Sequence, residues 1–136
     1  MATGSSNGQQ NDMSARFFQK LASGVPGVLF IYWLSADRES HRYPFVSDQV
    51  QTLFGIDPAV LNENADAVFS LIHPDDADVI IDSIVESALK LASWRYRGRL
   101  RLRNGEYEWF EVQSEPERQS DGSTIWYGQF HNIQHY

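Results

Sequence analysis

Cysteine is absent from the 136 residues of this sequence. Its absence excludes disulfides, thiolate nucleophiles, cysteine-rich zinc sites and chromophores attached through a cysteine. Long apolar runs are missing too, since none approaches the roughly 18–20 residues with which a helix crosses a bilayer. The polar start, MATGSSNGQQND, lacks the apolar segment of a secretory signal. We therefore expect no direct membrane insertion and a cytoplasmic location, although a longer parent protein could be membrane-anchored.

Positive charge is also scarce. Lysine and arginine number 11 against 18 acidic residues, which sets the formal net charge at −7. Five of the basic residues are arginines at alternate positions from Arg95 to Arg103, and without these five the charge would be −12. Such an acidic surface opposes general affinity for nucleic acids and for anionic membranes. We expect no nucleic-acid partner.

Length and composition favour one folded domain. The 42% hydrophobic and 13% aromatic content support a packed globule rather than a disordered chain. We expect residues 1–13 to be a flexible leader or a cloning remnant. Residues 14–24 are predicted to form a flanking helix, with Phe17, Phe18 and Leu21 on one side at helical spacing. The sequence stops next to an apparent strand, which suggests a module of a longer protein.

Two strands are predicted ahead of a group of helices. The run VLFIYWL (28–34) has the length of a buried strand, whereas RYPFV (42–46) contains a proline that favours an edge strand. Helices are predicted over 47–54, around 58–61 and 65–72, and over 74–92. The last of these carries one broad apolar stripe: Ile80, Ile81, Ile84, Val85, Ala88 and Leu89.

The arginine run is predicted to belong to a β-hairpin. Its arginines alternate with apolar residues at a period of two, and Asn104-Gly105 is typical of a type I′ turn. A tight turn would pair Arg103 with Glu106, Arg101 with Glu108, Leu102 with Tyr107 and Leu100 with Trp109. With a last strand over 124–133, the element order predicts an α+β domain with one antiparallel sheet and helices over one face.

Four segments in this order resemble a PAS domain. They are PFVSDQVQTLFGIDPAVL, LIHPDDADVIIDSIVESA, RLRLRNGEYEWFE and DGSTIWYGQFHNI, and the resemblance covers residues 25–135. The closest subclass has an HPDD turn and is found in sensor histidine kinases and diguanylate cyclases. The resemblance implies a five-stranded antiparallel sheet in the order 2-1-5-4-3, with helices around a small internal cavity. It also implies a sensory or dimerisation module rather than an enzyme.

The residues predicted to face such a cavity, and so to form the ligand pocket, are Tyr96, Arg99, Trp109, Tyr127, Gln129 and His131. A core filled by the large rings of this set is an open alternative. Arg99 matches a recurrent arginine of the family, and its guanidinium fork would suit a carboxylate ligand. For the arginine run as a whole, a solvated strand face with cross-strand Arg–Glu pairs is the favoured interpretation, ahead of a docking surface for a second subunit.

Several cofactor and metal sites are not supported. The light-sensing flavin relatives need a cysteine on a mid-domain helix, and the haem-binding relatives often use a histidine on the long helix, where residues 75–92 contain none. Flavin held without a covalent bond by Trp94 or Trp109 is an open alternative. The identity of any cofactor is left undetermined. His73 in LIHPDD is interpreted as a turn and cap residue, and no metal site or catalytic set is predicted.

The expected function is therefore a PAS sensory module that relays small-molecule or partner binding to an effector domain. Phe17, Phe18 and Leu21 are the expected homodimer contacts. Asn132-Ile133 is the expected signal junction, where the family usually has Asp-Ile-Thr. One alternative is a protein-interaction module with a closed core and no ligand. A small α+β cavity enzyme is a weaker one.

Overall fold

The computed structural model describes residues 16, 19, 20, 24 and 27–134 of the chain. The leader expected over 1–13 and the expected dimer contacts Phe17, Phe18 and Leu21 lie outside the described residues. Arg16, Gln19 and Lys20 are helical. The Gln19 amide donates to Val46 O and accepts from the backbone N–H of Asp48, each at 3.2 Å, so this helical position contacts the folded domain.

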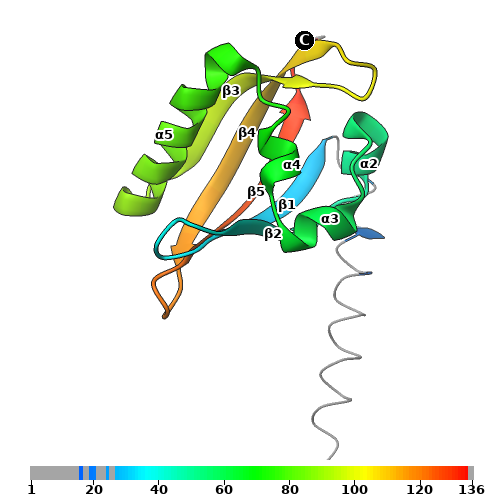
Figure 1. The fold of residues 1–136 in the computed structure, drawn as a ribbon. Coiled ribbons are helices and arrows are strands. Elements are labelled where there is room, and N and C mark those ends of the chain that lie inside the picture. Colours follow the sequence, from blue (N-terminus) through cyan, green and yellow to red (C-terminus); the bar gives the residue numbers. More distant parts are fainter. Residues whose placement is uncertain (1–15, 17–18, 21–23, 25–26, 135–136) are drawn as a thin grey trace, which may run out of the picture.

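Five strands form one antiparallel sheet in the order β2-β1-β5-β4-β3, as predicted (Figure 1). The strands are β1 (Val28–Leu34), β2 (His41–Val46), β3 (Trp94–Arg101), β4 (Tyr107–Arg118) and β5 (Thr124–Asn132). In β1 every second side chain is buried, which is the period-two pattern of a sheet with one covered face. The buried set is Val28, Phe30, Tyr32 and Leu34.

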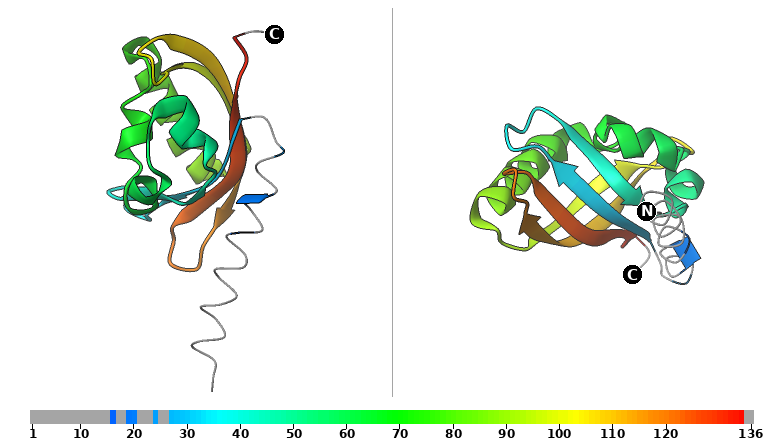
Figure 2. Two further views of the ribbon diagram at one scale, coloured as in Figure 1. Left: turned by 90° about the vertical axis from the view of Figure 1, so that its right-hand side faces the viewer. Right: turned by 90° about the horizontal axis from the view of Figure 1, so that it is seen from below.

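Four described helices lie over that face of the sheet (Figure 2). They are α2 (Gln49–Phe54), α3 (Pro58–Glu63), α4 (Asp66–Phe69) and α5 (Pro74–Lys90). Two start with a proline in the first turn, and α2 ends at Gly55 with a φ of 73°, a left-handed conformation that favours glycine. The predicted segment 65–72 is shorter than expected because α4 ends at Phe69.

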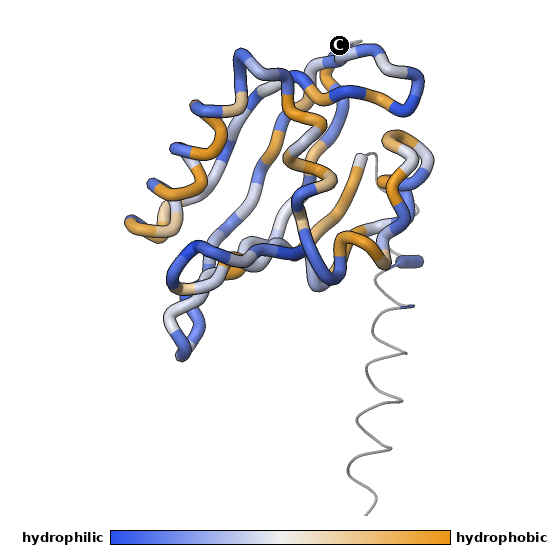
Figure 3. Tube along the Cα trace, viewed as in Figure 1, coloured by the Kyte–Doolittle hydropathy of each residue, from blue (hydrophilic) through white to orange (hydrophobic). Residues whose placement is uncertain are grey.

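The core lies between the helices and the sheet, and Figure 3 shows β1 as hydrophobic and α5 as alternately hydrophobic and hydrophilic along its length. Trp126 and Phe110 are the largest completely buried side chains. The predicted stripe of α5 is only partly covered: Ile80, Ile84 and Ala88 are buried, whereas Ile81 and Leu89 are 47% and 68% exposed. The apolar side of α5 is therefore wider than the part of the helix that packs against the sheet.

The register predicted for the β3–β4 hairpin is wrong by one residue. Arg101 pairs with Tyr107, Leu100 with Glu108 and Arg99 with Trp109. The Gly105 N–H donates to Leu102 O and closes a turn centred on Arg103 and Asn104, and Gly105 alone of the turn has a positive φ, 91°. This is a three-residue connection with a glycine bulge, not a two-residue type I′ turn, and the extra residue shifts every pair.

Both edges of the sheet are partly covered. Beside β3, Leu71 and His73 exchange backbone hydrogen bonds with Arg101 and Arg99, and Ile72 forms a β-bridge with Leu100. Beside β2, the backbone N–H of Ala65 donates to His41 O, and the Asn62 amide donates to Tyr43 O. Covered edges do not offer a template for adding another strand.

Candidate functional site

An internal cavity of about 40 Å³ lies between the helices and the sheet. Its walls come from all five strands, from α4 and α5, and from Ile72 between them. Most of the lining is aliphatic or aromatic, and Tyr43 and Tyr96 bring the hydroxyl groups. The volume holds about one water molecule. An organic ligand needs roughly 300 Å³ or more, so it would enter only if the walls moved apart.

Gly98 keeps part of this space open. A Cβ atom at this position would lie 2.8 Å from Ile80 Cδ1 and 2.9 Å from Tyr96 Cε1. Tyr43 packs against Phe30 and Tyr32, and burial raises the pKa of its hydroxyl well above the ordinary value. Tyr43 therefore remains protonated at physiological pH and can donate a hydrogen bond.

Of the six residues predicted to form the pocket, Tyr96 lines this cavity and the other five do not. Trp109 and Tyr127 are 41% and 46% exposed, and they lie on the opposite face of the sheet. The one-residue shift places Trp109 opposite Arg99, with the guanidinium carbon 5.0 Å from the centre of its ring. Gln129 and His131 are half-buried and share the strand parity of Tyr127. A ligand role remains a prediction for Tyr96.

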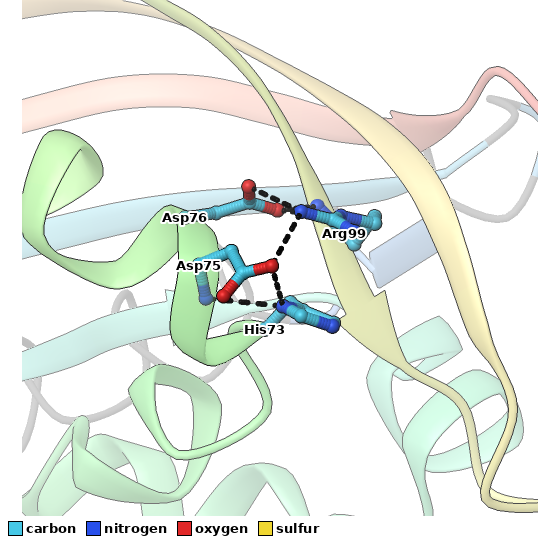
Figure 4. Close-up of polar contacts among 4 residues, drawn as sticks. All are labelled: His73, Asp75, Asp76 and Arg99. Atoms are coloured by element: carbon cyan, nitrogen blue, oxygen red, sulfur yellow. Dashed lines mark hydrogen bonds and ion pairs between the residues drawn. The ribbon is translucent and has the colours of Figure 1, made fainter.

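Arg99 contacts a carboxylate of the protein itself, Asp76 on α5 (Figure 4). Its Nε donates to Asp76 Oδ2 at 3.0 Å and its Nη2 to Oδ1 at 2.9 Å, which is the bidentate geometry that a guanidinium favours. The backbone N–H of Arg99 donates to the same carboxylate at 2.9 Å. These hydrogen bonds lower the pKa of Asp76, which is only 9% exposed.

The turn before α5 completes this network. His73 is the N-cap of α5, as predicted, and its Nδ1 accepts from the backbone N–H of Asp75 at 3.1 Å. Asp75 lies 3.9 Å from Arg99 Nη2 and also places negative charge at the positive end of the helix dipole. These contacts form a polar joint between the start of α5 and the edge strand β3.

One of the arginines in the run forms a cross-strand pair with a glutamate. Arg97 Nε donates to Glu111 Oε2 at 2.7 Å, so an Arg–Glu pair does form across the hairpin. The partners expected for Arg101 and Arg103 are displaced by the shifted register. Glu108 instead accepts from the Asn132 amide at 2.5 Å.

The segment predicted to be the signal junction is held by hydrogen bonds, one of which needs an amide. Asn132 Oδ1 accepts from the backbone N–H of Gln134 at 2.7 Å, a role that an aspartate could also fill. The amide nitrogen of Asn132 donates to Glu108, which an ionised aspartate could not do. The backbone N–H of Ile133 donates to Trp109 O at 2.9 Å. This chain has Asn132 where the family usually has the aspartate of Asp-Ile-Thr, and Glu108 on the neighbouring strand β4 accepts the hydrogen bond that the amide donates.

Sequence reasoning missed two pairings in this region. It gave no partner to Asp76 and assigned Arg99 to a ligand, because the contact joins residues that are 23 positions apart in the sequence. It gave no role to His41, which lies between the Tyr32 hydroxyl at 2.7 Å and Asp66 Oδ1 at 2.5 Å. Isolated polar residues such as these carry no periodic signal.

The described residues contain no group of three or more His, Cys, Asp or Glu side chains placed to bind a metal ion. None of the helices formed by these residues is long and apolar enough to span a membrane.

A family model described as "PAS fold" matches residues 43–130 of the chain. The comparison with curated proteins found no match. Domains of this fold in signalling proteins are sensory rather than catalytic modules, and they commonly dimerise and connect to effector domains.

Solved structures with the same fold include three domains of signalling proteins. The N-terminal domain of a diguanylate cyclase with a PAS/PAC sensor from Marinobacter aquaeolei has 15% identity and a TM-score of 0.63, over 79% of this chain and 95% of that one. A domain assigned to a light and redox sensing histidine kinase from Haloarcula marismortui has 22% identity and a TM-score of 0.62, over 87% and 98%. A sensory box histidine kinase/response regulator from Burkholderia thailandensis has 17% identity and a TM-score of 0.59, over 86% and 84%. By its fold and its family match, the chain belongs to the PAS-fold family.

Proposed function

We propose that this chain is a non-enzymatic sensory and dimerisation module that relays the binding of a small molecule or a partner to an effector domain outside this sequence. The observation that carries the proposal is the apolar cavity whose walls include α5 and all five strands. An occupant that enlarges the cavity would push its walls apart, and α5 is one of these walls. Because Asp76 and Arg99 join α5 to β3, such a movement would also reach the hairpin and the Asn132–Glu108 contact.

A closed-core interaction module is the second candidate. The cavity volume of about 40 Å³ favours it, since this space is far below that of an ordinary ligand pocket. The two candidates differ in whether the protein carries a molecule when it is isolated from cells.

Native mass spectrometry of protein purified from cells tests this difference. A reproducible extra mass, lost on denaturation, is the result expected for a sensory module. Val112→Phe, which fills the cavity, should abolish the extra mass, whereas the matched Val79→Phe should retain it because Val79 is 57% exposed on α5. If the unsubstituted protein carries no extra mass, the result favours the closed-core module.

The dimer and junction parts of the proposal rest on the sequence. Phe17, Phe18 and Leu21 would form an apolar helix face that pairs two copies, and Asn132 and Ile133 would lead to the effector. Replacing Phe17 and Phe18 with serine should lower the mass measured by light scattering. An unchanged mass would remove these residues as dimer contacts. We propose a cytoplasmic location for this module.

A further inference from the structure

A second, larger hollow lies on the outside of the helical layer. This groove has a volume of about 500 Å³ and runs between α5 and the β1–β2 hairpin, whose turn lies near the lower end of α5 in Figure 1. It is separate from the internal cavity, and its volume lies in the range of small-molecule sites. None of the groove residues named below belongs to the pocket predicted from the sequence.

The floor of the groove is apolar. It is formed by Ile81, Ile84 and Val85 of α5, by Phe69 of α4 and by Leu34 of β1. Ile81 remains 47% exposed there. An occupant with an apolar body would cover surface that now faces water.

The rim of the groove carries an excess of negative charge. The carboxylates of Glu39, Glu63 and Asp66 line it, against the single guanidinium of Arg38. A rim of this composition attracts a cation and repels an anion. Charge complementarity thus favours an occupant that carries a positively charged group.

One of the three carboxylates is held in place from inside the fold. Asp66 Oδ1 lies 2.5 Å from His41 Nε2, and because a carboxylate can only accept, this nitrogen carries a proton. His41 Nδ1 lies 2.7 Å from the hydroxyl of Tyr32, which is buried in the core. The Asp66 side chain is nonetheless 79% exposed, so its other oxygen can accept a hydrogen bond from a ligand.

Phe69 separates the groove from the internal cavity, since its ring lines both. It packs on His41 with ring centres 4.9 Å apart and on Tyr32 at 5.6 Å. An occupant of the groove would therefore contact the same side chain that closes the cavity.

We propose that this groove binds a small organic cation with an apolar body, such as an aromatic or aliphatic amine. The ammonium group contacts Asp66 and Glu63 at the rim, and the apolar body packs on Phe69, Ile84 and Val85. The site is external and does not depend on a ligand in the internal cavity.

The test is an NMR titration of the ¹⁵N-labelled protein with three probes that share one body: 2-phenylethylamine, 2-phenylethanol and 3-phenylpropionate. Saturable shifts at groove amides are expected with the amine, with affinity about tenfold higher than for the neutral or anionic probe. Asp66→Asn and Glu63→Gln should each weaken amine binding several-fold. Val85→Trp, which fills the groove, should abolish it.

Asp78→Asn is the matched control, because it makes the same change of charge on α5 outside the groove lining. It should leave the affinity for the amine unchanged. Glu63→Gln keeps the His41–Asp66 contact, so it tests the rim charge even if Asp66→Asn disturbs the fold.

Three results would overturn the proposal. Equal affinity for all three probes would show that charge does not select the occupant. Amine-induced shifts confined to cavity residues such as Phe110 would place the ligand in the internal cavity, a result that would support the sensory proposal while removing this one. Concentration-dependent shifts at the groove without a probe, together with a doubled mass, would identify a second copy of the chain as the occupant.

Discussion

The two long sides of α5 differ in how they meet the rest of the domain. Toward β3, β4 and β5 the helix is joined by polar contacts along its whole length. At its start Asp76 receives the guanidinium of Arg99; further along, the indole nitrogens of Trp94 and Trp126 donate to Ser83 and Ser87 at 2.7 and 2.9 Å. Toward the β1–β2 hairpin the helix presents Ile81, Ile84 and Val85 to the open groove.

This difference indicates which movements of α5 the fold resists. Hydrogen bonds between buried or half-buried partners are directional, so they fix the position of α5 along the sheet. Apolar side chains beside the groove have no directional partner. A shift of α5 on that side therefore costs less free energy. Substitutions that remove a contact from each side of α5 in turn test this difference through the free energy of unfolding.

Among substitutions that remove a polar contact, Asp76→Ala should have the largest effect on stability. It removes the bidentate partner of Arg99 and leaves the backbone N–H of that residue without its acceptor. We expect a loss of about 2 to 3 kcal/mol in the free energy of unfolding, measured by urea denaturation at pH 7. Asp78→Ala, on an exposed part of the same helix, should change it by less than about 0.5 kcal/mol. Equal effects of the two variants would show that the joint contributes nothing.

Ser87→Ala should have the next largest effect. Ser87 is 4% exposed, accepts from Trp126 Nε1 and donates to Ala92 O, so its loss leaves a buried indole N–H unpaired. We expect a loss of about 1 to 2 kcal/mol by the same measurement. Ser83→Ala should cost less because the Ser83–Trp94 hydrogen bond is only partly buried. If Ser83→Ala cost more, burial would not be what sets the strength of these contacts.

Acidification should reduce the difference in free energy of unfolding between the unsubstituted protein and Asp76→Asn. Hydrogen bonds from Arg99 lower the pKa of Asp76 in the folded state, so the stability from its charge is complete above about pH 4, its unfolded range. That stability is lost as the pH falls through the lower folded value. Unfolding free energies of both proteins between pH 7 and pH 2 should therefore converge, and a constant gap would contradict the assignment.

Ile81→Ser should have the smallest effect. Ile81 is 47% exposed at the groove, so its removal takes little apolar surface out of the core. We expect a change within about 0.5 kcal/mol. Ile84→Ala, one turn along and 4% exposed, should cost about 2 to 4 kcal/mol and serves as the buried comparison. A large loss for Ile81→Ser would mean that the groove side is packed in solution.

Much of the fold could be predicted because its signals are local. The period-two burial of β1, the alternation of arginines with apolar residues in β3, and the cap at His73 each depend on residues close together in the sequence. The strand order followed from the resemblance to PAS domains, and it is the order observed. The site was harder to predict, because one extra residue in the turn at Gly105 moved Trp109 to the outer face of the sheet.

Local patterns in the sequence were enough to place the strands and helices, to indicate which side of β3 faces the core, and to identify the family. The pairing of Arg99 with Asp76, the contact of Asn132 with Glu108 and the groove beside Asp66 are evident only in the folded domain. Periodicity reports on neighbours in the chain. A polar pair between distant segments, or the space left between two packed elements, exists only once those elements have met.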